Sequence, residues 1–140
     1  MSSIKYTTDI NDITAEMLDG GFFVGWPNPP CTDVHLKILQ NAYCFVVAID
    51  EATGKVIGFV NAISDGVLSA YIPLLEVLPE YKGRGIGKRL VEIALEKLDG
   101  LYMIDICHDD DVTAFYKKLG AFGCKGSVFR NHAAQSGRLD

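Results

Sequence analysis

Three apolar segments follow one another in the middle of the chain, and only short turns separate them. The segments are Tyr43–Ile49, Val56–Ile63 and Leu68–Leu78. The turns around Gly54 and Gly66 are too short to hold a crossover helix, so each strand must run antiparallel to the one before it. This pattern predicts a three-stranded antiparallel meander at the centre of the fold.

The flanking segments predict how the meander is extended and covered. The expected helices are Asp9–Leu18, Asp33–Gln40, Ile86–Leu98 and Asp110–Leu119, and the further strands are Ile4–Thr7 and Leu101–Cys107, with short closing pieces at Phe122 and Val128–Arg130. Because a helix precedes Leu101–Cys107, that strand is expected to pair in parallel with the strand before the helix. The predicted fold class is α+β: a mixed, mostly antiparallel central sheet flanked by helices, in a single domain over residues 1–140.

The composition limits the classes of partner. The net charge of −5 at pH 7 differs from the basic face that nucleic-acid binders carry, so no nucleic-acid partner is expected. The longest apolar run is too short to span a membrane, and the first residues contain no apolar signal-peptide core. None of the four cysteines forms a C-x-x-C pair. We therefore expect reduced thiols in a cytoplasmic protein without a membrane partner.

A glycine-rich segment joins the last strand of the meander to the most regular predicted helix. Its sequence is Lys82-Gly83-Arg84-Gly85-Ile86-Gly87-Lys88. Glycine lets the backbone approach a ligand closely, and the N–H groups at a helix N-terminus favour an anion such as a diphosphate. A Walker A loop would need Gly at position 82 and Ser or Thr at position 89, and a dinucleotide fingerprint would need Gly at position 88. The sequence satisfies neither pattern.

The glycine loop does match the pattern [QR]-x-x-G-x-[GA], with Lys82 in the first position, and here the sequence resembles the GNAT N-acetyltransferase superfamily. A second stretch, Ala114–Phe122, is similar to the family's F-Y-x-x-x-G-F signature with one extra residue, Ala121. The resemblance covers roughly residues 43–130 and is strongest to small bacterial members. It implies the GNAT acyl-CoA N-acyltransferase fold and an enzyme, without a metal, that moves the acetyl group of acetyl-CoA to a primary amine by direct attack in a ternary complex.

The resemblance also implies roles for individual residues. The glycine loop would hold the diphosphate of acetyl-CoA, mainly through backbone N–H groups, and the backbone N–H of Val77 would meet the oxyanion. Tyr116 would be the catalytic acid that protonates the departing thiolate. Asp109 stands where many relatives carry an asparagine near the cofactor. The implied cofactor-binding residues are Val77, Lys82, Gly83, Arg84, Gly85, Ile86, Gly87, Lys88 and Asp109.

The sequence leaves the general base open. An alkylammonium has a pKa of about 10.4, so some group must take its proton. Tyr71 and Pro73 occupy positions where some relatives place a catalytic Glu or His, and neither is an ordinary base at neutral pH. Glu76 is the nearest carboxylate, but strict strand alternation puts it on the opposite face from Tyr71 unless a β-bulge changes the parity. Glu76 and a water chain are both candidates.

Other polar and aromatic residues allow two interpretations. His108 and the acids Asp109–Asp111 look like a metal cluster, but acids that open a helix are expected to cap it and to interact with its dipole instead. His35 and His132 are expected at the surface. Asp105 is either an acid on the substrate side or a satisfied buried carboxylate. The aromatic residues that either line an acceptor pocket or pack in the core are Phe22, Phe23, Trp26 and Tyr43.

Two functions remain open at the level of the sequence. The first is the enzyme described above, with a small-molecule or peptide amine as acceptor. The alternative is a non-catalytic acyl-CoA-binding sensor or interaction module on the same fold, which the missing conventional base favours. Exposed edge strands are also compatible with a homodimer.

Overall fold

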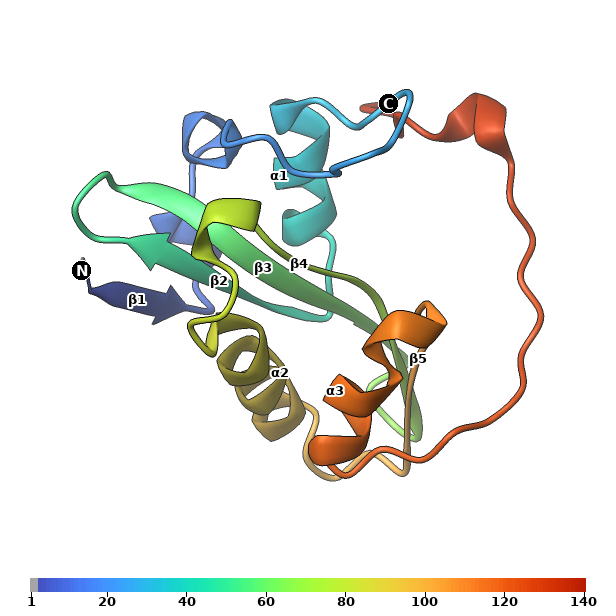
Figure 1. Cartoon of the computed structure of the whole chain (residues 1–140). Coiled ribbons are helices and arrows are strands. Elements are labelled where there is room, and N and C mark those ends of the chain that lie inside the picture. The colour runs from blue at the N-terminus through green and yellow to red at the C-terminus, as the bar shows by residue number, and fades with distance from the viewer. Residues whose placement is uncertain (1–2) are drawn as a thin grey trace.

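The computed structural model describes residues 3–140, which form one five-stranded sheet with helices on both faces (Figure 1). The strands are β1 (Ile4–Thr7), β2 (Cys44–Asp50), β3 (Lys55–Ser64), β4 (Ser69–Val77) and β5 (Met103–Ile106). They lie in the sheet in this order. Neighbours from β1 to β4 are antiparallel, and β5 pairs with β4 in parallel. The predicted meander and the parallel strand beside it are therefore confirmed.

The α-helices are α1 (Thr32–Gln40), α2 (Ile86–Lys97) and α3 (Thr113–Lys118). α2 packs across β2, β3 and β4, while α1 lies over the opposite face of the sheet (Figure 1). α2 comes very close to β3 at Gly58, where an added Cβ would lie 3.2 Å from Cδ1 of Leu90. Because β2 is covered on both faces, all its residues but the first are buried, which explains the unbroken apolar run from Cys44 to Ile49.

The first predicted helix is wrong. In place of a continuous helix over Asp9–Leu18, the chain forms two separate 3₁₀ turns, with Ile13 extended between them. The turns are Ile10–Asp12 and Ala15–Leu18. The side chain of Asp9 accepts a hydrogen bond from the N–H of Asn11 at 2.9 Å. Local side-chain bonds of this kind compete with a regular helix, so the chain turns and then leaves the helical conformation.

The other predicted elements agree with the structure to within two residues at each end, except for those near the C-terminus. The predicted helix over Asp110–Leu119 divides into a 3₁₀ turn, Asp110–Val112, followed by α3. The closing strands at Phe122 and Val128–Arg130 are wrong: residues 121–131 form neither helix nor strand, and they lead away from β5 toward α1 (Figure 1). Glycines interrupt the apolar pattern of this segment, and glycine weakens a strand.

β4 contains a β-bulge. Tyr71 pairs with Ile63, and Leu74 pairs with Asn61, so β4 has two residues where β3 has one. The extra residue brings Tyr71, Leu74 and Glu76 to the same face of the sheet. The strict alternation that would separate Glu76 from Tyr71 is therefore wrong for this strand.

The described residues contain free cysteine thiols at all four cysteine positions. Over residues 3–140, no helix combines the length and the apolar character needed to cross a bilayer. The same residues contain no cluster of three His, Cys, Asp or Glu side chains that could hold a metal ion.

Candidate active site

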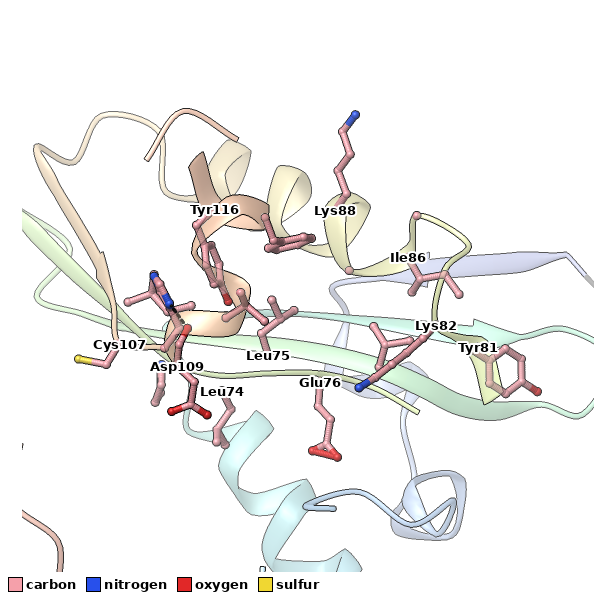
Figure 2. Close-up of a pocket in the computed structure, with 18 of the residues that line it drawn as sticks. Leu74, Leu75, Glu76, Tyr81, Lys82, Ile86, Lys88, Cys107, Asp109 and Tyr116 are labelled. Atoms are coloured by element: carbon pink, nitrogen blue, oxygen red, sulfur yellow. Dashed lines mark hydrogen bonds between the residues drawn. The ribbon is translucent and has the colours of Figure 1, made fainter. Parts of the chain in front are cut away.

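A cavity lies where β4 and β5 stop pairing. The two strands pair from Ser69 and Met103 as far as Ile72 and Ile106. Beyond this point a cavity of about 880 Å³ opens beside β4, a volume suited to a small-molecule ligand (Figure 2). Its borders are β4 residues 73–77, the glycine loop, residues 106–109 at and just after the end of β5, and side chains from α3 and from the loop before α1.

The backbone of β4 has groups that face this cavity. The N–H of Leu78 donates to the carbonyl of Ile57, on β3, at 2.8 Å. Because the direction of the backbone N–H and C=O groups alternates along a strand, these groups point toward β3 in every second residue before Leu78. By the same alternation, the backbone groups of Leu75 and Val77 point toward the open edge. The family resemblance implies the oxyanion contact at this N–H of Val77.

Backbone conformation shapes the glycine loop. Gly83 and Gly85 have φ angles of 81° and 78°, in the left-handed region that glycine adopts without strain. An added Cβ at either position would meet no described atom within 4 Å. Glycine is therefore required here by the backbone conformation and not by a lack of space. Gly85 is the N-cap of α2, whose first N–H groups have no partner inside the helix. Lys82 and Lys88 line the cavity beside this positive helix end.

Tyr81 anchors the start of the glycine loop. Its hydroxyl donates to Oδ2 of the buried Asp50, at the end of β2, at 2.6 Å. This hydrogen bond to a carboxylate raises the pKa of Tyr81. The guanidinium of Arg84 lies over the Tyr81 ring, 5.5 Å from its centroid. Among the loop cations, Arg84 therefore packs on Tyr81, whereas Lys82 and Lys88 line the cavity.

Tyr116 enters the cavity from α3. Its side chain is 9% exposed, and burial raises its pKa, so the phenol stays protonated at neutral pH and can donate a proton. In Figure 2 the hydroxyl points toward Leu75. The ring of His108 stacks on the Tyr116 ring, with the centroids 4.6 Å apart and the planes at 24°. From the sequence, His108 was considered only as part of a possible metal cluster, and its position in the cavity was missed.

Glu76 binds backbone groups of the loop that precedes α1. Both of its carboxylate oxygens accept from the N–H of Phe23, at 2.9 Å each, and Oε1 also accepts from the N–H of Val24 at 3.3 Å. Phe23 has a φ of 64°, which is rare for a bulky residue. These bonds fix a strained turn and argue for a structural role of Glu76. No sequence pattern signals the contact, because its partners lie 53 residues apart.

An aromatic cluster around His35 supports this turn from behind. The centroid of the His35 ring lies 4.3 Å from that of Phe59, 5.3 Å from Phe22 and 5.0 Å from Phe23. His35 is 1% exposed, so the expected surface position is wrong: this face of α1 packs against the loop. Burial lowers the pKa of His35 to about 4. Its Nε2 has no hydrogen-bond partner among residues 3–140.

The four aromatic candidates for the acceptor pocket divide between the cavity and other places. Phe23 and Trp26 line the cavity, and their ring centroids are 5.0 Å apart. Phe22 is buried in the core. Tyr43 lies beside the turn at Gly66, where an added Cβ would come within 3.3 Å of its ring.

The acidic residues near β5 differ from expectation in two respects. Asp109 occupies the N-cap position of the turn Asp110–Val112, but its side chain makes no capping bond there, so a side-chain cap by Asp109 is wrong, whereas Asp110 and Asp111 do lie in the first turn. Its carboxylate borders the cavity and points toward Leu74 in Figure 2. Asp105 is exposed, which excludes a buried carboxylate at that position.

Comparison with known proteins identifies the family to which this site belongs. Residues 11–121 match the Acetyltransferase (GNAT) family. The chain belongs to the GNAT acetyltransferase family. The fold of this GNAT protein is similar over its full length to a candidate acetyltransferase of Deinococcus radiodurans R1 seen in a crystal structure, with a TM-score of 0.94, 41% identity and coverage of 100% of both chains. The predicted GNAT fold is thereby confirmed.

Curated relatives resemble this GNAT protein over part of their own length. It is 32% identical over 101 residues to the uncharacterised N-acetyltransferase ycf52 of Pyropia yezoensis, covering 69% of this chain and 58% of the relative. It is 30% identical over 112 residues to the GCN5-related N-acetyltransferase 1, chloroplastic, of Arabidopsis thaliana, covering 76% of this chain and 56% of the relative. The chain therefore spans little more than half the length of these N-acetyltransferases.

One solved structure with a similar fold contains CoA. The aminoglycoside N-acetyltransferase AAC(6')-Iy, 20% identical with a TM-score of 0.63 over 94% of this chain and 95% of its own, was solved in complex with CoA. In the present GNAT protein the glycine loop fits the diphosphate of such a ligand. The loop offers free helix N–H groups, no Cβ atoms at Gly83 and Gly85, and the two lysines that line the cavity.

Proposed function

We propose that this GNAT protein transfers the acetyl group of acetyl-CoA to a primary amine by direct attack in a ternary complex. The observation that carries the proposal is the single cavity beside β4, which extends from the anion-binding glycine loop past Tyr116 to Phe23 and Trp26. A donor and an acceptor held together in one cavity react without a covalent enzyme intermediate, because binding has already brought the reacting atoms together.

The residues around the cavity support each step. The glycine loop, with Lys82 and Lys88, binds the diphosphate of the donor. The backbone N–H of Val77 donates to the thioester oxygen and stabilises the negative charge that develops there as the amine attacks. Tyr116 gives its proton to the CoA sulfur when the C–S bond breaks. The N–H contact and the proton transfer from Tyr116 both meet charge that is absent from the ground state, so both contribute directly to the rate.

The acceptor side of the cavity favours an amine that arrives as a cation. Its walls are the rings of Phe23 and Trp26 and the side chain of Leu74. The carboxylates of Glu76 and Asp109 add negative charge to this side. Aromatic faces and carboxylates attract an ammonium group and repel a substrate that carries its own anion. We therefore place a small-molecule or peptide amine here.

A binding series followed by a turnover assay tests the proposal. Thermal shifts are measured with acetyl-CoA, CoA, ATP and NAD, because a ligand at about 100 times its Kd adds about 2.7 kcal/mol to the stability. Thiol release from acetyl-CoA is then followed with 2-phenylethylamine, spermidine, glucosamine and a peptide with a free N-terminus. We expect selective stabilisation by acetyl-CoA and CoA, and thiol release with at least one amine. Stabilisation without release for every amine would favour the non-catalytic module, and stabilisation only by ATP or NAD would overturn the proposal.

A further inference from the structure

His108 borders the cavity, and the steps above leave it without a role. It lies two residues after β5, and its ring stacks on the ring of Tyr116, the proposed acid. The proposed reaction still lacks a group that takes the proton of the ammonium acceptor. An imidazole is the side chain best suited to accept a proton near neutral pH.

One hydrogen bond determines which nitrogen of His108 can accept that proton. Nδ1 lies 2.8 Å from the backbone carbonyl oxygen of Asp109. A carbonyl oxygen can only accept, so Nδ1 must carry the hydrogen of this bond. In the neutral ring Nε2 is then the unprotonated nitrogen, and its lone pair is the basic site.

Glu76, the base candidate from the sequence, is engaged in a different way. Each of its carboxylate oxygens already accepts from the N–H of Phe23. Taking a substrate proton would weaken those bonds and release the strained turn at Phe23. Protonation of Nε2 in His108 has no such cost, because it leaves the bond between Nδ1 and Asp109 intact.

His108 also borders a second cavity of about 580 Å³, which lies between β5 and residues 121–128. Most residues around this second cavity are exposed, so water reaches it and can carry a proton away. Other titratable groups border both cavities. Those on the first cavity are Glu76, Tyr81, Lys82, Lys88, Cys107, Asp109 and Tyr116. Those on the second are Asp105, Cys107, Asp110, Tyr116, Lys117, Cys124 and Lys125.

We propose that His108 is the general base of the reaction and that Nε2 takes a proton from the ammonium acceptor, directly or through one water. The inference rests on the proposed function. The freed lone pair of the amine attacks the acetyl carbon, and a C–N bond forms while the carbonyl electrons move to oxygen. As the C–S bond breaks, the sulfur takes the proton of Tyr116. The tyrosinate recovers a proton from the new amide nitrogen, and His108 releases its proton to water. The products are the amide, CoA thiol and one free proton.

Replacement of His108 by phenylalanine is the principal test, because the new ring keeps the stacking on Tyr116 and lacks a basic nitrogen. His132→Phe, in the C-terminal segment outside both cavities, is the matched control. The probe is the alkylamine of the panel above that releases thiol fastest. At pH 7 we expect His108→Phe to lower kcat/KM by about 100-fold, with the thermal shift by acetyl-CoA unchanged and His132→Phe at the wild-type rate. The deficit should shrink about tenfold per pH unit above neutrality, because the free amine then becomes available without a base.

A nucleophile that needs no base separates proton removal from positioning. Hydroxylamine is already unprotonated at pH 7, so wild type and His108→Phe should use it at rates equal within about twofold. An equal loss with both nucleophiles would show that His108 only positions Tyr116, and an unchanged rate with the alkylamine would exclude it as the base. A ¹⁵N spectrum in which Nδ1 is the unprotonated nitrogen would also overturn the inference. Failure of the wild type with every amine would instead overturn the proposed function.

Discussion

The two sides of the cavity are built in different ways. The donor side, residues 82–88, is one continuous segment, and its shape comes from backbone conformations such as the positive φ of Gly83 and Gly85. The acceptor side, formed by Phe23, Trp26, Leu74, Glu76 and Asp109, comes from three separate segments. Its main internal link is the bond between the Glu76 carboxylate and the N–H of Phe23.

This difference separates the two binding functions. A site made of backbone N–H groups depends on a few glycines and tolerates change in most side chains. A site made of side chains from distant segments can alter its specificity while the fold stays the same. We therefore expect substitutions on the donor side to change binding of acetyl-CoA, and substitutions on the acceptor side to change the stability of the local turn and the choice of amine.

The largest effect is expected at Tyr116, where the two sides meet. Tyr116→Phe removes the proton donor but keeps the ring that stacks on His108, so turnover should fall about 100-fold with little change in acetyl-CoA binding. Thiol release and thermal shift measure the two quantities. The control is Tyr102→Phe, because Tyr102 is 84% exposed and precedes β5. Weakened acetyl-CoA binding at unchanged turnover would instead assign Tyr116 to the donor side.

The next effect tests the donor side alone. Gly85→Ala and Gly54→Ala both place a Cβ on a residue with positive φ and open surroundings, so each should lose about 1–2 kcal/mol of stability. Only Gly85 lies at the N-terminus of α2. We expect Gly85→Ala to raise the Kd for acetyl-CoA about 30-fold, equivalent to about 2 kcal/mol, and Gly54→Ala to leave it unchanged. Equal affinities, measured by titration calorimetry, would contradict the placement of the diphosphate.

The position of the glycine loop at the start of α2 could be predicted from the sequence because its residues are neighbours in the chain. The meander could be predicted for the same reason, since short turns leave only antiparallel pairing. The predictions that were wrong depended on contacts between residues that are distant in the sequence. The bulge in β4 changed the face on which Glu76 lies relative to Tyr71. The burial of His35 depends on the loop that carries Phe22 and Phe23, which no periodicity in α1 reveals.

A smaller effect concerns the link that organises the acceptor side. Glu76→Ala removes the acceptor for the N–H groups of Phe23 and Val24, and should lower the free energy of unfolding by about 2 kcal/mol. Glu76→Gln keeps one acceptor oxygen and should lose less than half as much. Urea unfolding measures both variants, and thermal shifts with acetyl-CoA should be unchanged. If both variants were as stable as wild type, the strained turn at Phe23 would not depend on Glu76.

The smallest effect is a pH dependence that originates behind the acceptor side. Burial lowers the pKa of His35 to about 4, below the value of about 6.5 for an exposed imidazole in the unfolded chain. The unfolded chain therefore binds more protons between these two values, so the stability is fully present above pH 6.5 and falls as the pH drops toward 4. At pH 5.5 the loss from this one residue should be about 1.4 kcal/mol relative to pH 7.5.

Replacement by a residue that cannot titrate isolates this term. His35→Leu keeps an apolar side chain among Phe22, Phe23 and Phe59 and removes the Nε2 atom that lacks a partner. The difference in unfolding free energy between pH 7.5 and pH 5.5 should then be about 1.4 kcal/mol smaller than in wild type, as measured by urea unfolding at both pH values. The same pH change should leave the wild-type Kd for acetyl-CoA nearly constant, because His35 supports only the acceptor side. An unchanged pH dependence in His35→Leu would mean that the cluster opens and lets His35 titrate in the folded protein. The acceptor side would then be mobile, and its aromatic wall could adapt to amines of different shape.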